Sequence, residues 1–185
     1  MTREPRLYLR QPTEEDARQL LRWLDDKGHQ KGYFGTDVDP SEWMEDYASL
    51  APSMDRLRMF AGVTKDADAV VAFANFKPGY PVPWVWDCEI IIDPKAVNSG
   101  YGFEALALGI DEIFSTEPAI KLAGPVISSN ERSYRLAEKL GFVREGTLRQ
   151  HLLQEDGSAK DAYLYGLLKS EWRSPFTSST DGADQ

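Results

Sequence analysis

The chain has 185 residues, of which 42% are hydrophobic and 28% are charged, a composition typical of one soluble globular domain. Its single cysteine, Cys88, excludes an intramolecular disulfide, and with only two histidines we expect no metal site. The formal net charge of −9 has the wrong sign for a protein that binds nucleic acid through its phosphates. No apolar run is long enough to span a bilayer, and the opening residues 1–5 lack the apolar segment of a signal peptide, so we expect a cytoplasmic protein with no membrane partner.

The first half of the chain predicts strands and helices in alternation. The hydropathy of the side chains alternates along residues 7–10, which indicates a short strand. Thr13-Glu-Glu-Asp16 resembles a capping box that opens a helix. A second helix is predicted from Asp39-Pro40-Ser41-Glu42 to about Leu50, with Pro40 at its first position. Residues 56–64 and 69–76 are β-rich runs separated by a short polar turn, which indicates an antiparallel hairpin.

The second half is organised around one strongly apolar strand. Residues 84–92 end in Glu89-Ile-Ile-Ile92, and this nearly continuous hydrophobic run is typical of a central strand that is covered on both faces. Gly141 favours the end of a helix, because glycine adopts the left-handed cap conformation at low cost. The other predicted elements are a helix at 100–115, a strand at 119–127, a helix at 130–140 and a hairpin of strands at 142–153 and 162–168.

This order of elements implies one α/β (α+β) domain, with a mixed sheet flanked by helices. We assign residues 6–173 to the domain. Residues 174–185 are rich in Ser, Thr, Asp and Gly and are predicted to form a disordered tail.

The segment with the clearest chemistry joins the apolar strand to the following helix. Its glycines, Gly100 and Gly102, leave backbone N–H groups uncovered at a helix start, which is a place where phosphates bind. Gly100 to Ala105 also satisfies the G-x-G-x-x-A pattern of dinucleotide-binding folds. That interpretation is disfavoured, because the next strand ends in Ser128-Ser129-Asn130 and not in an acid that would bind a ribose. The alternative is the pyrophosphate of coenzyme A.

At this junction the sequence resembles the GNAT superfamily of N-acetyltransferases, and in particular its RimJ/RimL branch. The resemblance extends from Leu7 to Trp172. It depends on several ordered motifs, which are Leu7-Tyr-Leu-Arg10 with Thr13-Glu-Glu-Asp16, Glu89 to Pro94 leading into Ser99-Gly-Tyr-Gly-Phe-Glu-Ala105, Asn130 to Phe142, Glu145-Gly-Thr-Leu-Arg149, and Asp161 to Leu168 followed by Glu171-Trp172.

The resemblance implies a fold and a cofactor. The GNAT fold has a mostly antiparallel sheet of about six to seven strands with about four helices, and its central strands splay apart to admit acetyl-CoA as co-substrate, with no metal. The family signature falls on residues 97–102, with Val97 where the family prefers Arg or Gln. Asn130 matches a family asparagine that contacts the pantetheine arm, although it could equally be a helix N-cap. The implied cofactor-binding residues are Ile91, Ile92, Val97, Asn98, Ser99, Gly100, Tyr101, Gly102, Phe103 and Asn130.

The resemblance also implies a catalytic base. Acetyl transfer to an amine needs a group that accepts a proton from nitrogen, and Glu89 is the carboxylate that matches the family position. Partial burial beside tryptophans and isoleucines would raise its pKa toward neutrality. The alternatives are an ion-paired, solvent-facing Glu89, with Asp87 or Asp161 as the base.

The acid that protonates the departing thiolate is a separate question. Many family members have a tyrosine where this chain has Ala137, and RimJ/RimL-like sequences often have a serine where this chain has Ser133. We therefore name Ser133, with Tyr134 and solvent as alternatives. Ser133 could also serve only to satisfy a backbone group at the helix start.

The acceptor pocket of the fold is built from the first two helices and the final hairpin. Its candidate residues here are the aromatic side chains Tyr33, Phe34, Trp43 and Trp84, set in an acidic region that suits a cation. The predicted function is transfer of acetyl from acetyl-CoA to a primary amine, which is a peptide N-terminus or a small cationic amine such as a polyamine or aminoglycoside. A non-catalytic acyl-CoA-binding module is the alternative. The resemblance further implies a homodimer.

Overall fold

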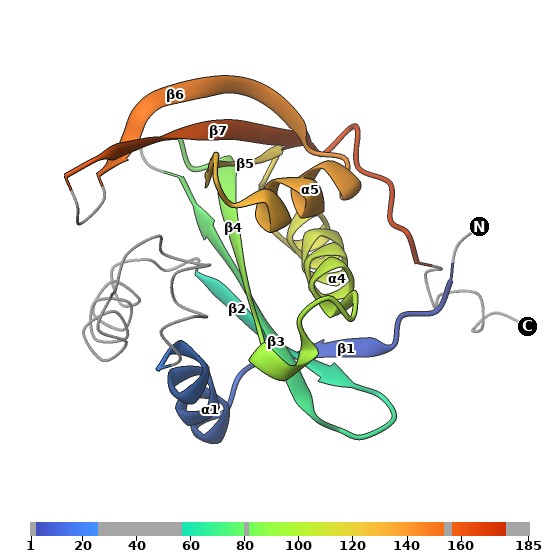
Figure 1. Ribbon diagram of the computed structural model, residues 1–185. Coiled ribbons are helices and arrows are strands. Elements are labelled where there is room, and N and C mark those ends of the chain that lie inside the picture. Colours follow the sequence, from blue (N-terminus) through green and yellow to red (C-terminus); the bar gives the residue numbers. More distant parts are fainter. Residues whose placement is uncertain (1–2, 26–56, 80–81, 154–156, 177–185) are drawn as a thin grey trace, which may run out of the picture.

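The computed structural model describes residues 3–25, 57–79, 82–153 and 157–176. Its centre is a seven-stranded sheet with the strand order β1-β2-β3-β4-β5-β7-β6 (Figure 1). The strands are β1 (Leu7–Arg10), β2 (Arg58–Thr64), β3 (Val70–Pro78), β4 (Val85–Ile92), β5 (Lys121–Ile127), β6 (Val143–Leu153) and β7 (Ala159–Leu168). In the described ranges the helices are α1 (Glu14–Leu24), α4 (Tyr101–Thr116), α5 (Glu131–Lys139) and a 3₁₀ turn, η2 (Pro94–Ala96).

These bounds confirm the predicted strands, the helix that opens at Thr13 and the helices at 100–115 and 130–140 to within a few residues. Thr13 caps α1, and its capping box with Asp16 is present as predicted. The helix predicted at 39–50 lies outside the described residues. None of the described helices is long and apolar enough to cross a membrane.

Helices cover both faces of the sheet (Figure 1). On one face, Leu20 and Trp23 of α1 pack against Phe73 and Ile91. On the other face, α4 packs its apolar side onto β1, β3 and β4, and its core cluster contains Phe76. Gly109 of α4 lies so close to β3 that a Cβ atom there would come within 2.4 Å of the Phe76 ring. The core therefore consists of two apolar layers separated by the sheet.

One pair of neighbouring strands is joined over a short distance only. β4 and β5 are parallel and pair only at Val85 with Lys121 and Trp86 with Leu122. Beyond these two pairs, β4 stays bonded to β3 as far as Ile92, and β5 stays bonded to β7 as far as Ile127. The two strands therefore separate toward their C-terminal ends, as the family resemblance implied for the central strands.

A buried carboxylate fixes the start of α4. Glu104 is 0% exposed and accepts hydrogen bonds from Arg3 Nη2 at 2.9 Å, from the backbone N of Arg6 at 2.8 Å and from Arg6 Nε at 2.7 Å. Arg6 Nη2 also donates to the carbonyl oxygen of Ser99 at 3.0 Å. Residues 3–6 therefore hold both the first turn of α4 and the loop that precedes it.

The last described residues pack on the domain. Ser174 Oγ donates to Asp111 Oδ2 at 2.6 Å, and Phe176 is 6% exposed and forms a parallel bridge with Arg3. The boundary predicted at residue 174 therefore falls inside a packed segment. The rest of the predicted tail, residues 177–185, lies outside the described residues.

The Glu104 cluster gives a stability prediction. The substitution Glu104→Gln keeps the shape of the side chain but turns an NH₂ group toward arginine donors, so we expect a loss of about 2 kcal/mol in the free energy of unfolding. Urea unfolding measures this value. Glu112→Gln, an exposed site on the same helix, is the control and should stay within about 0.5 kcal/mol of the wild type. Equal losses in the two variants would contradict the role given to Glu104.

Candidate functional site

The candidate site is the open end of the gap between β4 and β5. Because these strands are parallel, their C-terminal ends lie at the same edge of the sheet, where α/β folds commonly bind ligands. β4 leads through η2 into α4, and β5 leads through residues 128–130 into α5. The N-termini of two helices therefore lie beside the gap, and each contributes partial positive charge.

The loop before α4 is shaped to present backbone N–H groups. Asn98 and Gly100 have positive φ values of 66° and 86°, and Gly100 is the N-cap of α4 without any side-chain cap. Residues 98–100 are exposed. The N–H groups of the first helical turn have no partner within the helix itself. A loop of this kind can bind an anionic group such as a phosphate, and it contains the glycines for which the family resemblance implied cofactor binding.

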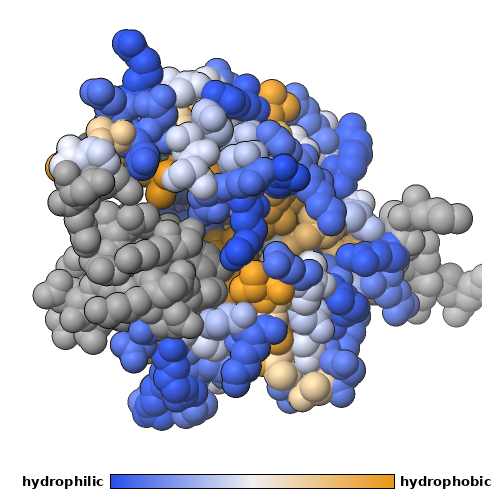
Figure 2. Space-filling view, in the orientation of Figure 1, coloured by the Kyte–Doolittle hydropathy of each residue, from blue (hydrophilic) through white to orange (hydrophobic). Residues whose placement is uncertain are grey.

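The other predicted cofactor residues surround this loop. Val97 ends η2. Ile92 lies at the end of β4, and its Cδ1 would be 3.4 Å from a Cβ atom added at Gly102. Ile91 is 3% exposed and points into the α1 layer, so only its backbone faces the gap. Phe103 packs against the α4 core cluster, and Lys139 Nζ lies over its ring, 4.9 Å from the ring centre. Figure 2 shows apolar surface near the centre of the view, in the region of β4 and α4.

The start of α5 forms the other side of the open end. Asn130 caps this helix, and its Oδ1 accepts a hydrogen bond from the backbone N of Ser133 at 3.1 Å. The helix-cap role considered for Asn130 is thus confirmed. Ser133 lies on the first turn and is partly buried, and the ring of Tyr134 packs edge-on against Tyr163 with 5.9 Å between ring centres.

Two carboxylates of β4 lie on the α1 face of the sheet. Asp87 and Glu89 are two residues apart and therefore point to the same side, and Lys77 of β3 lies between them in space. Lys77 Nζ is 3.0 Å from Glu89 Oε1 and 3.9 Å from Asp87 Oδ2. The expected burial of Glu89 is wrong: its side chain is 43% exposed and ion-paired, because its position on the strand turns it toward Lys77 and solvent.

Asp87 is the more buried of the two carboxylates. Its side chain is 29% exposed and lies over Gly124 of β5, where an added Cβ would come within 2.4 Å of Asp87 Oδ1. Burial, followed by the charge of Glu89, raises the pKa of Asp87 to about 6, against the opposing effects of Lys77 and of the Cys88 N–H. A carboxyl group with this pKa can accept a proton near neutral pH.

Cys88 points to the opposite face of β4 from these carboxylates. It packs against the core cluster that contains α4. Burial, with a smaller effect from the charges of Asp87 and Glu89, raises the pKa of the Cys88 thiol well above its usual range. The thiol is therefore a poor nucleophile.

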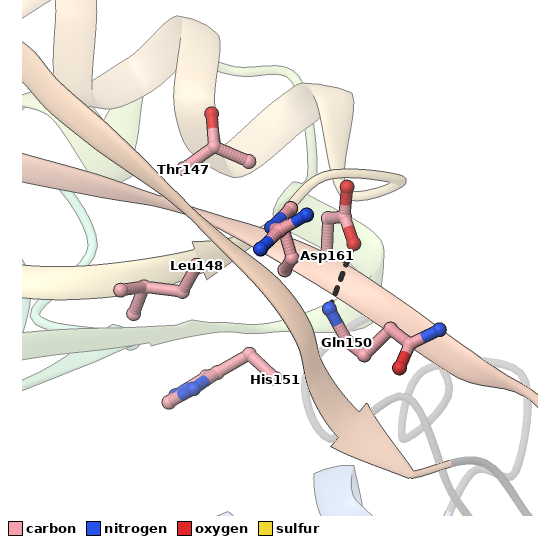
Figure 3. Close-up of a pocket in the computed structure, with 6 residues that line it drawn as sticks. Thr147, Leu148, Gln150, His151 and Asp161 are labelled. Atoms are coloured by element: carbon pink, nitrogen blue, oxygen red, sulfur yellow. Dashed lines mark hydrogen bonds between the residues drawn. The ribbon is translucent and has the colours of Figure 1, made fainter.

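Asp161, the second alternative base, has a structural role. β6 bulges between Leu148 and Leu152, where Gln150 has a positive φ of 50°. Asp161 Oδ1 accepts a hydrogen bond from the Gln150 backbone N at 2.8 Å and so fixes the bulge (Figure 3). The bulge borders a groove of about 730 Å³, lined by Thr147, Leu148, Arg149, Gln150, His151 and Asp161. Because the Asp161 carbonyl accepts from Ser128 N at 2.9 Å, this groove adjoins the end of β5.

The aromatic residues proposed for the acceptor are described only in part. Trp84 is 50% exposed and precedes β4, at the end where β4 and β5 are still paired. Its carbonyl oxygen accepts from Ile120 N at 2.9 Å. Tyr33, Phe34 and Trp43 lie outside the described residues. Lys77 was not identified from the sequence, because only the pairing of β3 with β4 brings it to Asp87 and Glu89.

The comparisons with known proteins agree on one family. The model of the acetyltransferase (GNAT) domain matches residues 6–143, which is more than half of the chain. The Bacillus subtilis protein named Uncharacterized N-acetyltransferase YoaA is 25% identical over 179 residues, which are 89% of this chain and 94% of that protein.

Solved structures share the fold. Spermidine N-acetyltransferase from Vibrio cholerae, in complex with CoA and spermine, has a TM-score of 0.76 at 20% identity over 90% of this chain and 97% of that one. The ribosomal-protein-S5-alanine acetyltransferase from Vibrio fischeri has a TM-score of 0.71 at 18% identity over 94% and 99%. The predicted fold is confirmed.

Asp87 gives a prediction about stability and pH. Its folded-state pKa lies above the ordinary 3.8, so ionising it in the folded protein costs stability as the pH rises from about 4 to about 6. Asp87→Asn should therefore be more stable than the wild type by about 2 kcal/mol at pH 8, and the difference should vanish near pH 4. Urea unfolding at several pH values measures it. Asp66→Asn, in the exposed β2–β3 turn, is the control and should match the wild type at pH 8; a destabilised Asp87→Asn at pH 8 would contradict the assignment.

Proposed function

Since the chain belongs to the GNAT acetyltransferase family and is an acetyl-transferring enzyme, we propose that it moves acetyl from acetyl-CoA directly to a primary amine. The observation that carries this proposal is the gap between β4 and β5, with the uncapped start of α4 at its open end. A carboxylate of raised pKa lies where the gap begins. Direct transfer, with no acetylated enzyme, is consistent with the poor nucleophilicity of Cys88.

The cofactor site is proposed along the loop and the gap. Backbone N–H groups of residues 98–103 would hold the pyrophosphate, and the unpaired inner edges of β4 and β5 would hold the pantetheine arm, with Asn130 beside it. Val97 in place of the family Arg or Gln removes a side-chain contact but no backbone donor. When bound, acetyl-CoA supplies the acetyl thioester that the amine attacks.

We assign the proton-accepting role to Asp87 in preference to Glu89. Asp87 is the more buried carboxylate and has a raised pKa, whereas Glu89 is held by Lys77. As the amine nitrogen bonds to the acetyl carbon, its proton passes to the Asp87 carboxylate and the carbon–sulfur bond breaks. Ser133 Oγ, on the first turn of α5, is proposed to donate a proton to the departing thiolate, which solvent can also supply.

The proposed class of acceptor follows from the carboxylates on the α1 face of the sheet. Asp87 and Glu89 together attract a cationic amine. The two structural neighbours act on spermidine and on the alanine of ribosomal protein S5 according to their names, so a polyamine and a peptide N-terminus are both proposed as acceptors. The RimJ/RimL branch and the homodimer stay predictions.

The activity test is a thiol-release assay with acetyl-CoA and a panel of peptides, polyamines and aminoglycosides. The wild type should turn over at least one class, with a rate that rises through about pH 6 as Asp87 loses its proton. Asp87→Asn should lower kcat/KM about 100-fold or more and remove this rise. Glu89→Gln is the matched variant. It should retain most activity and move the rise to lower pH, because it removes a charge that raises the pKa of Asp87. A larger loss in Glu89→Gln than in Asp87→Asn would reverse the assignment.

Cofactor binding is tested separately through Gly100. Its φ of 86° disfavours a β-branched side chain, so Gly100→Val should distort the loop and weaken CoA binding about tenfold, measured by calorimetry. Gly157→Val is the matched control, because Gly157 also has a positive φ, 79°, with no atom within 4 Å of an added Cβ. Unchanged CoA affinity in Gly100→Val, or equal weakening in Gly157→Val, would contradict the placement of the pyrophosphate.

A further inference from the structure

Asn75 of β3 is a buried polar side chain without a hydrogen bond. It is 2% exposed, and neither Oδ1 nor Nδ2 has a hydrogen-bond partner among the residues that the structure describes. Buried amides in folded proteins are almost always paired, since each unpaired group loses its bonds to water. The other positions of β3 from Val70 to Phe76 are apolar, so an apolar residue would suit the packing better.

The position of Asn75 connects it to the proposed acceptor site. It pairs across the sheet with Glu89 and lies two residues before Lys77, so these three side chains share the α1 face. Directly opposite residues of an antiparallel pair have Cβ atoms about 5 Å apart. Asn75 is therefore next to Glu89, whose side chain is 43% exposed.

The chemistry of the amide limits the ligands that would satisfy it. Oδ1 accepts hydrogen bonds and Nδ2 donates them, so a ligand that pairs with both atoms needs an N–H group and a carbonyl oxygen close together. A polyamine carries N–H donors without a carbonyl, and would leave Nδ2 unpaired. An amine with a neighbouring carbonyl, such as the first residue of a peptide, pairs with both atoms.

We propose that Asn75 is a specificity-determining residue of the acceptor site, which pairs with the amino group and the neighbouring carbonyl of an α-amino amide and so favours that acceptor over a polyamine. This inference rests on the proposed function. The buried amide is unpaired without acceptor, and the acceptor supplies its missing partners. A site built to bond a polar group strongly rejects an analogue that lacks the group.

The test compares two acceptors of the same shape, of which only one has a carbonyl beside the carbon that bears the amino group. These are Ala-Gly-Gly-amide and its analogue in which a trans carbon–carbon double bond replaces the first peptide bond, so that no second amine is created. The wild type should prefer the intact peptide by at least tenfold in kcat/KM. In Asn75→Leu, which keeps the branched shape of the side chain but replaces its polar atoms by methyl groups, kcat/KM for the intact peptide should fall at least tenfold, that for the analogue should change less than threefold, and the KM for acetyl-CoA should stay constant. The midpoint of urea unfolding should rise, because an unpaired buried amide is removed.

Two further variants keep the test decisive. Asn75→Asp keeps the size of the side chain but has no N–H donor when ionised, so it should also lower the preference for the intact peptide. This variant tests the proposal if Asn75→Leu does not fold. Met59→Leu, on the β2 residue that pairs with Asn75, is the control and should leave the preference unchanged. A wild type that turns over amines without preferring the carbonyl, or a preference that survives Asn75→Leu and Asn75→Asp, overturns the inference. Absence of turnover with any amine is a different result, since it overturns the proposed function and with it this role of Asn75.

Discussion

The parting of β4 and β5 is the constraint on which the rest of the molecule depends. Each of these strands has a full antiparallel neighbour on its outer side, β3 and β7, and the two share only two residue pairs with each other. Their inner edges therefore expose backbone N–H and C=O groups that need partners. A chain that leaves this region open must fill it with water or with a ligand that carries amides of its own, and the pantetheine arm of CoA is such a ligand.

The two faces of the sheet carry different kinds of chemical group. On the α4 and α5 side, helix starts and an uncapped loop supply neutral backbone donors, which suit phosphate. On the α1 side, Asp87, Glu89 and Lys77 supply titratable groups, which suit an amine. Because the strands part between these faces, a thioester in the gap would meet the amine from one side while its phosphates stay on the other. In the site that we propose, the acetyl-CoA phosphates and the cationic amine would therefore bind on opposite faces of the sheet.

Local signals in the sequence predicted most of the fold. The capping box at Thr13, the apolar run at Ile90 to Ile92 and Gly141 each fixed an element within a few residues, because caps and periodicity depend only on nearby residues. The different environments of Glu89 and Asp87, on which the proposed choice of Asp87 depends, could not be predicted in this way. These environments depend on Lys77 of β3, which is ion-paired with Glu89, and on Gly124 of β5, which lies beneath Asp87. Contacts between neighbouring strands cannot be predicted from local sequence. Asn75 was also missed, since it lies in an apolar run that indicates core.

Cys88 has a practical consequence for work at the bench. It is the only thiol in the chain, and its raised pKa keeps it protonated and slow to oxidise or to react with electrophiles. The protein should therefore tolerate storage in air without reducing agents. An aromatic disulfide reagent added to a reaction mixture will register the thiol released from the co-substrate over a low background from the protein itself.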